Sequence, residues 1–444
     1  MQIKLAITRS TTGKPMNEQF VDVTDLDQLW DRPLKQAVTS ELWGENSTKE
    51  ARMHRIHTYP AKFPAFLAEL GIRYAMESGV RVRTVGDIFC GCGTVAHEAR
   101  RLGLKFWGCD INPVATLIAR AKSADIAPGE LIRQLALVLH EFDRASADVS
   151  LAPSARDRLQ RWFRPEQFAD LARLVNSIRL ITADGSAMRD VLLCLFSSIL
   201  KSCSQWKVRA IKPTFDLNKV PASVIAAFSQ QAHFLITAAV EAGDMSGQPQ
   251  ASIHLGSALT IECPPGGLDL LISSPPYVTS YEYADLHQLS SLFLGYADDH
   301  RDLREGSIGS TQHDFRLNKG IASLNSTATR VVFSLYDHDK RAAQSIANYF
   351  VDMQKVAVRA RHLVKPRGVA MFVIGNTQYH GVDVDNAGHL TESLLRAGFR
   401  RVRAVKRAIS NKSATPYRTS TGRFSRAQTA NHIYSHEYVL MAHR

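Results

Sequence analysis

Two short segments combine residue types that could support chemistry. In the first, residues 269–277 read Asp-Leu-Leu-Ile-Ser-Ser-Pro-Pro-Tyr, an apolar run that ends in a stiff polar turn. Polar acceptors that hold the N–H groups of a ring-bound amine favour a pyramidal nitrogen, whose lone pair can then attack an electrophile. Ser274 and the Pro275 carbonyl could be those acceptors, and Tyr277 offers a stacking face. We therefore take Ser274, Pro275, Pro276 and Tyr277 as candidate catalytic residues.

The second segment, residues 87–94, reads Asp-Ile-Phe-Cys-Gly-Cys-Gly-Thr and follows a predicted strand. Glycines here would let the backbone approach a ligand closely. An acid about 20 residues further on, at the end of the next predicted strand, can accept hydrogen bonds from both hydroxyls of a ribose. Asn112 follows and is suited to an adenine edge. The candidate cofactor-binding residues are Asp87, Phe89, Cys90, Gly91, Gly93, Thr94, Asp110 and Asn112.

The turn lacks one glycine of the pattern that binds dinucleotides. Residues 91–96 read Gly-Cys-Gly-Thr-Val-Ala, without the third glycine of that pattern. S-adenosylmethionine has no pyrophosphate, so it does not need the full cradle. We therefore expect S-adenosylmethionine as the cofactor. A nicotinamide enzyme with a degenerate loop is the competing interpretation.

The rest of the chain predicts the elements that must position these segments. Helical periodicity favours helices at residues 95–102, 350–363 and 390–397, with a turn at 365–368. Strands alternating with helices indicate an α/β protein with a seven-stranded, mostly parallel sheet whose final two strands are antiparallel. The predicted strands are residues 82–89, 104–109, 251–255, 268–273, 369–374, 399–405 and 437–442.

The alternation is interrupted by apolar stripes at helical spacing, which predict a helical insertion packed on the main domain. We expect four parts in the chain. They are an N-terminal arm (1–50), the cofactor-binding half (51–125), the helical insertion (126–250) and the catalytic half with a basic C-terminal loop (251–444).

The charge balance favours a polyanionic partner. The 444 residues carry a formal net charge of +12, and residues 400–444 hold ten Lys or Arg residues against one acid, Glu437. Lysine and arginine that neutralise phosphates release counterions and so bind nucleic acid. The alternative is that these basic residues form a solvent-exposed face with no nucleic-acid partner. The candidate nucleic-acid contacts are Lys412, Arg418, Arg423 and Arg426.

At these motifs the chain resembles the amino-methylating DNA methyltransferases, especially the N4-cytosine type. The family's cofactor motif is similar to residues 87–94, and its cytosine members carry Ser-Pro-Pro-Tyr, as at residues 274–277. The loop Tyr59-Pro60-Ala61-Lys62-Phe63-Pro64 looks like the family's separate cofactor motif. The resemblance thus implies cofactor contacts by Tyr59, Lys62 and Phe63.

The resemblance also implies a methyltransferase-type Rossmann fold and a transferase that methylates DNA at specific sites. It implies transfer from S-adenosylmethionine to the N4 amine of a cytosine flipped out of double-stranded DNA. A cognate restriction enzyme would be a possible partner in a restriction-modification pair. One departure is the run Gly256-Ser257-Ala258, where family members often have an acid.

Several alternatives stay open. Adenine-specific members more often carry Asp or Asn at the position of Ser274, so N6-adenine methylation is disfavoured without being excluded. RNA or protein-amide methylation and a catalytically inactive scaffold are further alternatives. Three segments could recognise the target DNA sequence. They are the helical insertion, the separate stretch 279–341, and the C-terminal loop.

Other chemistries find little support. Ring-carbon methylation needs a cysteine nucleophile, and its one candidate, Cys263, precedes the predicted strand. We expect no metal, since His54 and His57 lack a third ligand in the local sequence. The six cysteines form no CxxC pair, and we see no signal peptide or membrane-spanning run, so we expect a cytoplasmic protein.

Overall fold

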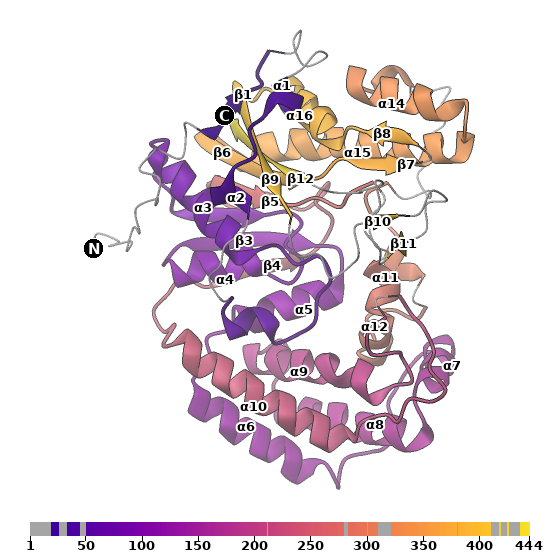
Figure 1. The fold of residues 1–444 in the computed structure, drawn as a ribbon. Helices are drawn as coiled ribbons and strands as arrows, with labels where there is room; N and C mark the ends of the chain where they lie inside the picture. Colours follow the sequence, from indigo (N-terminus) through magenta and orange to yellow (C-terminus); the bar gives the residue numbers. More distant parts are fainter. Residues whose placement is uncertain are drawn as a thin grey trace.

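The computed structural model describes residues 19–25, 33–44, 50–210, 212–278, 283–299, 301–309, 321–379, 381–409, 417–418, 424–425 and 436–444. Its central layer is an eight-stranded sheet (Figure 1). In spatial order the strands are β1 (Val21–Asp22), β9 (Arg401–Ala408), β12 (His436–His443), β6 (Val364–Ile374), β5 (Leu268–Ser273), β2 (Thr84–Asp87), β3 (Lys105–Asp110) and β4 (Ala251–Leu255).

Strand directions confirm the predicted fold class. The strands β6, β5, β2, β3 and β4 pair in parallel, whereas β12 runs antiparallel to both of its neighbours, β6 and β9. This is a mostly parallel, methyltransferase-type Rossmann sheet with an antiparallel final pair. The predicted seven strands are present, and β1 adds an eighth at the edge by pairing with β9. A strand of two residues is too short to show a periodic pattern.

Helices cover both faces of this sheet because its central strands are apolar on both sides. Leu270 and Ile272 of β5 are buried with α3 and α4, while Leu271, which points to the opposite face, is buried with α14, α15 and α16. The helices of the first layer are α3 (Ala65–Glu77) and α4 (Thr94–Arg101). Those of the second are α14 (Ser326–Tyr336), α15 (Lys340–Leu363) and α16 (Asn386–Arg396).

The predicted helical insertion is confirmed. Between α5 (Pro113–Lys122) and β4 the chain forms five helices, which share one buried apolar cluster with α5 and α12 (Gln288–Phe293). Figure 1 shows them gathered beneath α5, on the far side from β9 and β12. These helices are α6 (Pro128–Glu141), α7 (Pro153–Trp162), α8 (Pro165–Ile181), α9 (Ala187–Cys203) and α10 (Val224–Ala242).

Two elements differ most from their predicted bounds. The sequence predicts a turn at 365–368, whereas these residues lie inside β6, whose pairing with β5 shifts register between Leu268 and Leu270. Arg367 has a φ of +66°, so the Pro-Arg-Gly run bends the strand without ending it. The helix predicted from residue 350 begins ten residues earlier, at Lys340. Its start is capped by the side chain of Asp339, which accepts from the N–H groups of Arg341 and Ala342.

The remaining elements are short and lie outside the sheet. They are α1 (Pro33–Gln36), α2 (Glu41–Gly44), η2 (Arg52–Arg55), α11 (Tyr283–Leu286), η3 (Asp302–Arg304), η4 (Ile321–Ser323), β7 (Thr377–Tyr379), β8 (Val382–Val384), β10 (Tyr417–Arg418) and β11 (Phe424–Ser425). Among the described helices, none has both the length and the apolar character needed to span a membrane.

Candidate active site

The two motifs lie side by side at one edge of the sheet. Strands β2 and β5 are parallel neighbours, with Val85 opposite Leu270. The glycine turn follows β2 and the Ser-Pro-Pro-Tyr run follows β5, and the carboxyl ends of parallel strands share one edge of a sheet. A hydrogen bond of 2.5 Å from Ser273 Oγ to Asp87 Oδ1 joins the two strand ends directly. The glycine turn and the Ser-Pro-Pro run therefore lie at the same edge of the sheet.

The glycine turn adopts backbone that other residues avoid. Gly91 has a φ of +48° and Gly93 a φ of +74°, both in the left-handed region. A Cβ on Gly93 would lie 2.6 Å from the Cβ of Ala119, so the turn also packs closely against α5. Thr94, which opens α4, is buried at the base of this turn.

Asp110 is held facing the turn. Its Oδ2 accepts from the N–H of Gly91 at 2.8 Å, and its Oδ1 accepts from the N–H of Asn112 at 2.9 Å. Burial raises the pKa of Asp110, while these N–H groups oppose that rise. Each oxygen has a further lone pair, so the carboxylate retains acceptor capacity for two more donors.

The Asn112 side chain has a structural task. Its Oδ1 accepts from the N–H groups of Val114 and Ala115 and so caps α5. Its Nδ2 lies 2.8 Å from Nδ1 of His287, which places His287 beside Asp110 and the glycine turn. The amide nitrogen carries a second proton, so Asn112 keeps one donor for the predicted adenine contact.

Asp87 stabilises the start of the glycine turn through hydrogen bonds of its buried side chain. The side chain is buried, and the Oδ1 that Ser273 contacts also accepts from the N–H of Phe89 at 3.0 Å. Burial raises the pKa of Asp87 to about 7, against the opposing effect of these hydrogen bonds. Phe89 is partly buried against the α15 side of the core. Cys90 is buried, and burial raises the pKa of its thiol.

The loop at residues 57–64 closes the same region. The Tyr59 ring lies 3.5 Å from the position that a Cβ on Gly91 would take, and 5.2 Å from the ring centre of His287. The Lys62 ammonium donates to Glu50 Oε2 at 2.6 Å and to the His54 carbonyl at 2.9 Å. Lys62 therefore fastens the loop, while Tyr59 faces the glycine turn.

Phe63 does not share that position. It is partly buried against the cluster that α3 and α4 form with the sheet. Among the three residues expected from this loop, Tyr59 is thus the one whose ring approaches the glycine turn.

The Ser-Pro-Pro-Tyr run is fixed at both ends. Ser274 Oγ donates to the carbonyl oxygen of Val373, near the end of β6, at 2.9 Å. Pro275 is buried and Pro276 is half-buried. The Tyr277 hydroxyl donates to Glu437 Oε1 at 2.9 Å, and a Cβ on Gly375 would lie 3.1 Å from the Tyr277 ring. Burial and the Glu437 carboxylate raise the pKa of Tyr277 well above its usual range.

Glu437 and Arg407 are site residues that the sequence analysis missed. Arg407 donates to Glu437 Oε2 at 2.5 Å, and both residues are buried. The same guanidinium donates to the carbonyls of Trp43 and Gly44, at 3.0 and 3.2 Å, in the N-terminal segment. The available signal was that Glu437 is the one acid in a strongly basic stretch.

His287 was also missed. It is buried at 5% exposure beside Tyr59 and Asn112, and burial lowers its pKa to about 3. His57, whose Nε2 lies 2.9 Å from Ser197 Oγ, is a neighbour whose charge would lower that pKa further. This imidazole therefore stays neutral near pH 7.

The fold brings possible metal ligands to His54 that are distant from it in the sequence. His54 lies beside His97 and Glu98 of α4, and one donor atom of each falls within 4.8 Å of the others. The observed bonds favour a structural role, because Glu98 Oε1 bonds to His54 Nε2 at 2.7 Å and Glu98 Oε2 pairs with Arg101. Burial lowers the pKa values of both histidines.

The predicted nucleic-acid contacts fall mostly outside the described residues. Lys412, Arg423 and Arg426 lie there entirely. Arg418 belongs to β10, whose backbone pairs antiparallel with β11 through Arg418 and Phe424. Their role therefore stays a prediction.

Comparison with known proteins gives related sequences. Residues 9–120 match a family model described as DNA methylase, for N6 and N4 methyltransferases. The Type II methyltransferase M.MvaI of Kocuria varians is 23% identical over 403 residues, which cover 83% of this chain and 86% of that protein. The resemblance to the amino-methylating DNA methyltransferase family is thus confirmed.

Solved structures give a weaker likeness. Two structures of the rRNA methyltransferase aviRa from Streptomyces viridochromogenes align with 77% and 79% of this chain and with 92% and 94% of their own. Each is 11% identical with a TM-score of 0.29, a level from which we draw no conclusion.

Proposed function

We propose that this methyltransferase transfers a methyl group from S-adenosylmethionine to the N4 amine of a cytosine flipped out of double-stranded DNA. The observation that carries the proposal is the adjacency of the glycine turn after β2 and Ser274 after β5. A donor on the turn and an amine at residue 274 would meet at one edge of the sheet. The relative from Kocuria varians, by its name a Type II methyltransferase, supports a site-specific DNA substrate.

The residues at the turn suit S-adenosylmethionine. Asp110 keeps lone pairs for two ribose hydroxyls, and the two left-handed glycines keep side chains out of the ligand's path. Tyr59 borders the turn, and buried His287 lies beside it. When bound, S-adenosylmethionine supplies an electrophilic methyl group on a sulfonium. The missing acid at residues 256–258 leaves its adenine amine to backbone groups or Cys90.

Ser274 would orient the amine. Because its hydroxyl proton points to the Val373 carbonyl, its oxygen presents lone pairs that can accept one N–H of the cytosine amine. The Pro275 carbonyl would accept the other. Two acceptors fixed in this way favour a pyramidal nitrogen and direct its lone pair towards the glycine turn. Tyr277, whose hydroxyl is bonded to Glu437, would stack on the cytosine ring and fix the orientation of that ring.

The substrate is expected to reach the site by base flipping, since an amine within a stacked duplex cannot enter it. The net charge of +12 supports binding to DNA. The basic C-terminal loop, with Lys412, Arg418, Arg423 and Arg426, is our proposed backbone contact. The four-part division of the chain, a cognate restriction enzyme and a cytoplasmic location are parts of the same proposal.

The second candidate function is N6-adenine methylation, because the matching family model spans both N6 and N4 enzymes. An adenine amine could use the same two acceptors. Ser274, in place of Asp or Asn, favours cytosine. An RNA amino-methyltransferase is the remaining alternative.

Labelled methyl transfer separates these candidates. The full chain is incubated with tritiated S-adenosylmethionine and, separately, with unmethylated genomic DNA, total RNA and protein, and the products are digested to nucleosides or amino acids. We expect label in DNA and in N4-methylcytosine. Label in N6-methyladenine would favour the second candidate, and label confined to RNA or protein would refute the DNA assignment.

A further inference from the structure

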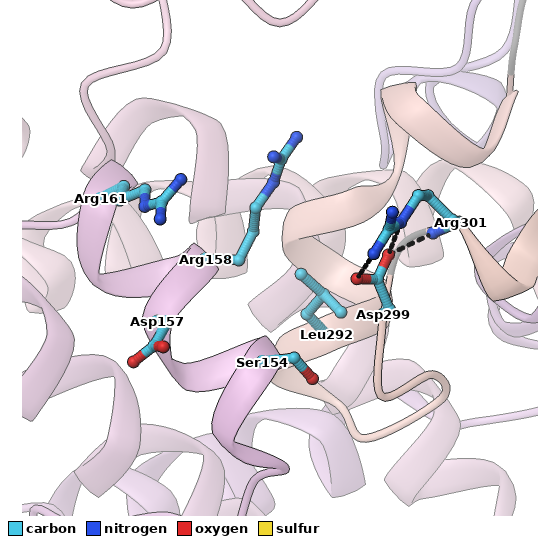
Figure 2. Close-up of a pocket in the computed structure, with 7 residues that line it drawn as sticks. All are labelled: Ser154, Asp157, Arg158, Arg161, Leu292, Asp299 and Arg301. Carbon is cyan, nitrogen blue, oxygen red and sulfur yellow. Dashed lines mark hydrogen bonds and ion pairs between the residues drawn. The ribbon is translucent and has the colours of Figure 1, made fainter.

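A hollow lies between α7 of the helical insertion and the segment that contains α12. It has a volume of about 380 Å³, and Leu292 of α12 lines it together with Asp299 and Arg301. Figure 2 shows Arg158 and Arg161 projecting from α7 towards the hollow, while Asp157 points away from Arg158. Hydrogen bonding between Ser154 Oγ and the Asp298 carbonyl, at 2.7 Å, joins the two walls.

The charged side chains that line the hollow are three arginines and two acids, Asp157 and Asp299, so the lining is net positive. Asp299 also lines it, but both of its oxygens are taken by Arg301, at 2.9 Å each. Among the described residues, neither Arg158 nor Arg161 forms an ion pair. Two arginines one helical turn apart, beside a neutralised Asp–Arg pair, provide donors for an anion with several oxygens.

Arg158 is held in a fixed direction. Its Nε donates to Gln288 Oε1 at 2.9 Å, and Gln288 is fully buried at the start of α12. Gln288 is in turn held by its own donation to the Asp285 carbonyl, at 2.9 Å. This leaves the terminal amino groups of the guanidinium for a ligand. An arginine held by a buried amide is better organised for binding than a freely rotating surface side chain.

The same helix connects the hollow with the cofactor side. His287, adjacent to Gln288, contacts Asn112 next to the ribose candidate Asp110. α11 and α12 also lie a few residues after the Ser-Pro-Pro-Tyr run in the chain. Gln288 and His287, consecutive in the chain, thus join Arg158 of the hollow to Asn112 on the cofactor side.

A basic loop extends this surface. Residues 204–210 and 212–219 lie between α9 and α10, and the Trp206 ring stacks on Trp162, at the end of α7, with ring centres 5.3 Å apart. This loop carries Lys207, Arg209 and Lys212, all exposed. The loop therefore adds three exposed cations near the end of α7.

We propose that Arg158 and Arg161 bind backbone phosphate of the DNA substrate flanking the extruded base, with the 207–212 loop continuing the contact. This inference rests on the proposed function, since it takes DNA as the substrate. It assigns part of substrate binding to the helical insertion, in addition to the C-terminal loop.

The test measures binding of a 24-base-pair unmethylated duplex by the full chain from 50 to 200 mM salt. For Arg158→Ala/Arg161→Ala we expect about tenfold weaker binding at 100 mM salt and a salt slope smaller by about two, one for each phosphate that is no longer neutralised. The control, Arg133→Ala/Arg144→Ala, removes two arginines in or just after α6, each paired with an acid of that helix, and should change neither quantity. Arg161→Glu is a second variant, at an exposed position, that leaves the Arg158–Gln288 bond intact. It should also weaken binding. This single change keeps the test valid if the double variant misfolds.

Failure of this inference differs from failure of the proposed function. If the arginine variants bind the duplex with unchanged affinity and slope while the unaltered chain still methylates DNA, the phosphate site is wrong and the function stands. If the arginine variants lose binding only to a single-stranded RNA of equal length, the site belongs to RNA and the inference is overturned. If the slope falls as expected but labelled methyl groups never enter DNA, the site is supported and the methylation proposal fails.

Discussion

Ser274 Oγ lies 2.9 Å from the carbonyl oxygen of Val373, to which it donates its proton. The bond crosses from the end of β5 to the end of β6, so the sheet itself orients the hydroxyl. A hydroxyl whose proton is committed in this way can act as an acceptor towards an amine. Ser273, one residue earlier, bonds in the opposite direction to Asp87 of β2. Two consecutive serines therefore join three neighbouring strands at the proposed site.

Asp110→Asn should weaken binding of S-adenosylmethionine by about tenfold to hundredfold. Charge-assisted hydrogen bonds contribute about 1.5–3 kcal/mol each, and the amide can replace only part of the carboxylate's acceptor capacity. Isothermal titration of the full chain measures the change, with the exposed Glu262→Gln as a control. Unchanged affinity in Asp110→Asn would show that the ribose assignment is wrong.

Glu437→Ala should destabilise the protein by about 3–5 kcal/mol, because it leaves the buried guanidinium of Arg407 without its partner. Glu437→Gln keeps an acceptor for Tyr277 and should cost less. Urea unfolding provides both free energies of unfolding. If Glu437→Ala unfolds at the same urea concentration as the unaltered chain, the ion pair contributes nothing to the fold.

Tyr277→Phe should lower kcat while leaving cofactor affinity unchanged. The ring remains, but it loses the hydroxyl bond to Glu437 that fixes its angle. In the background of Glu437→Ala, which has no acceptor for the hydroxyl, the same change should have a smaller effect, since the two residues act through one contact. Strictly additive effects on kcat would contradict this coupling.

Asp87→Asn should flatten the dependence of stability on pH. The pKa of Asp87 is raised to about 7 in the folded protein, from an ordinary value of 3.8. Between these values the folded state binds the extra proton, so Asp87 costs stability as pH rises through roughly 4 to 7. The amide stays neutral, so the variant should gain on the unaltered chain by at most about 4 kcal/mol across this window.

Urea midpoints at pH 5, 6, 7 and 8 provide the measurement. The advantage of Asp87→Asn over the unaltered chain should grow up to about pH 7 and then level off. A constant difference at all four values would mean that Asp87 ionises normally in the folded protein.

Much of the frame could be predicted from the sequence. The bounds of β4 and β5 agree with the predicted strands, because β4 alternates apolar and polar residues and β5 is a short, mostly apolar run. Two motifs that follow parallel strands of one sheet share an edge, so the adjacency of Gly91 and Ser274 could be expected. The edge strand β1 could not, because its two residues carry no pattern.

The supporting contacts were less predictable. Arg407, Glu437 and Tyr277 are joined only because β9, β12 and the end of β5 come together in the folded sheet. His287 resembles any polar residue of a short helix until Asn112 and Tyr59 surround it. Local spacing likewise gave no reason to expect His97 and Glu98 beside His54.

The role of Ser274 as the acceptor for the target amine is tested most directly by Ser274→Ala. Single-turnover methyl transfer to DNA and cofactor binding are measured on the same preparation, with the exposed Ser252→Ala as the matched control. Loss of one preorganised hydrogen-bonding group at a reacting centre costs about 100-fold to 1,000-fold in rate. We predict a loss of that size with a cofactor Kd within about twofold of the unaltered chain. Full transfer activity in Ser274→Ala, or a parallel loss of cofactor binding, would contradict the account.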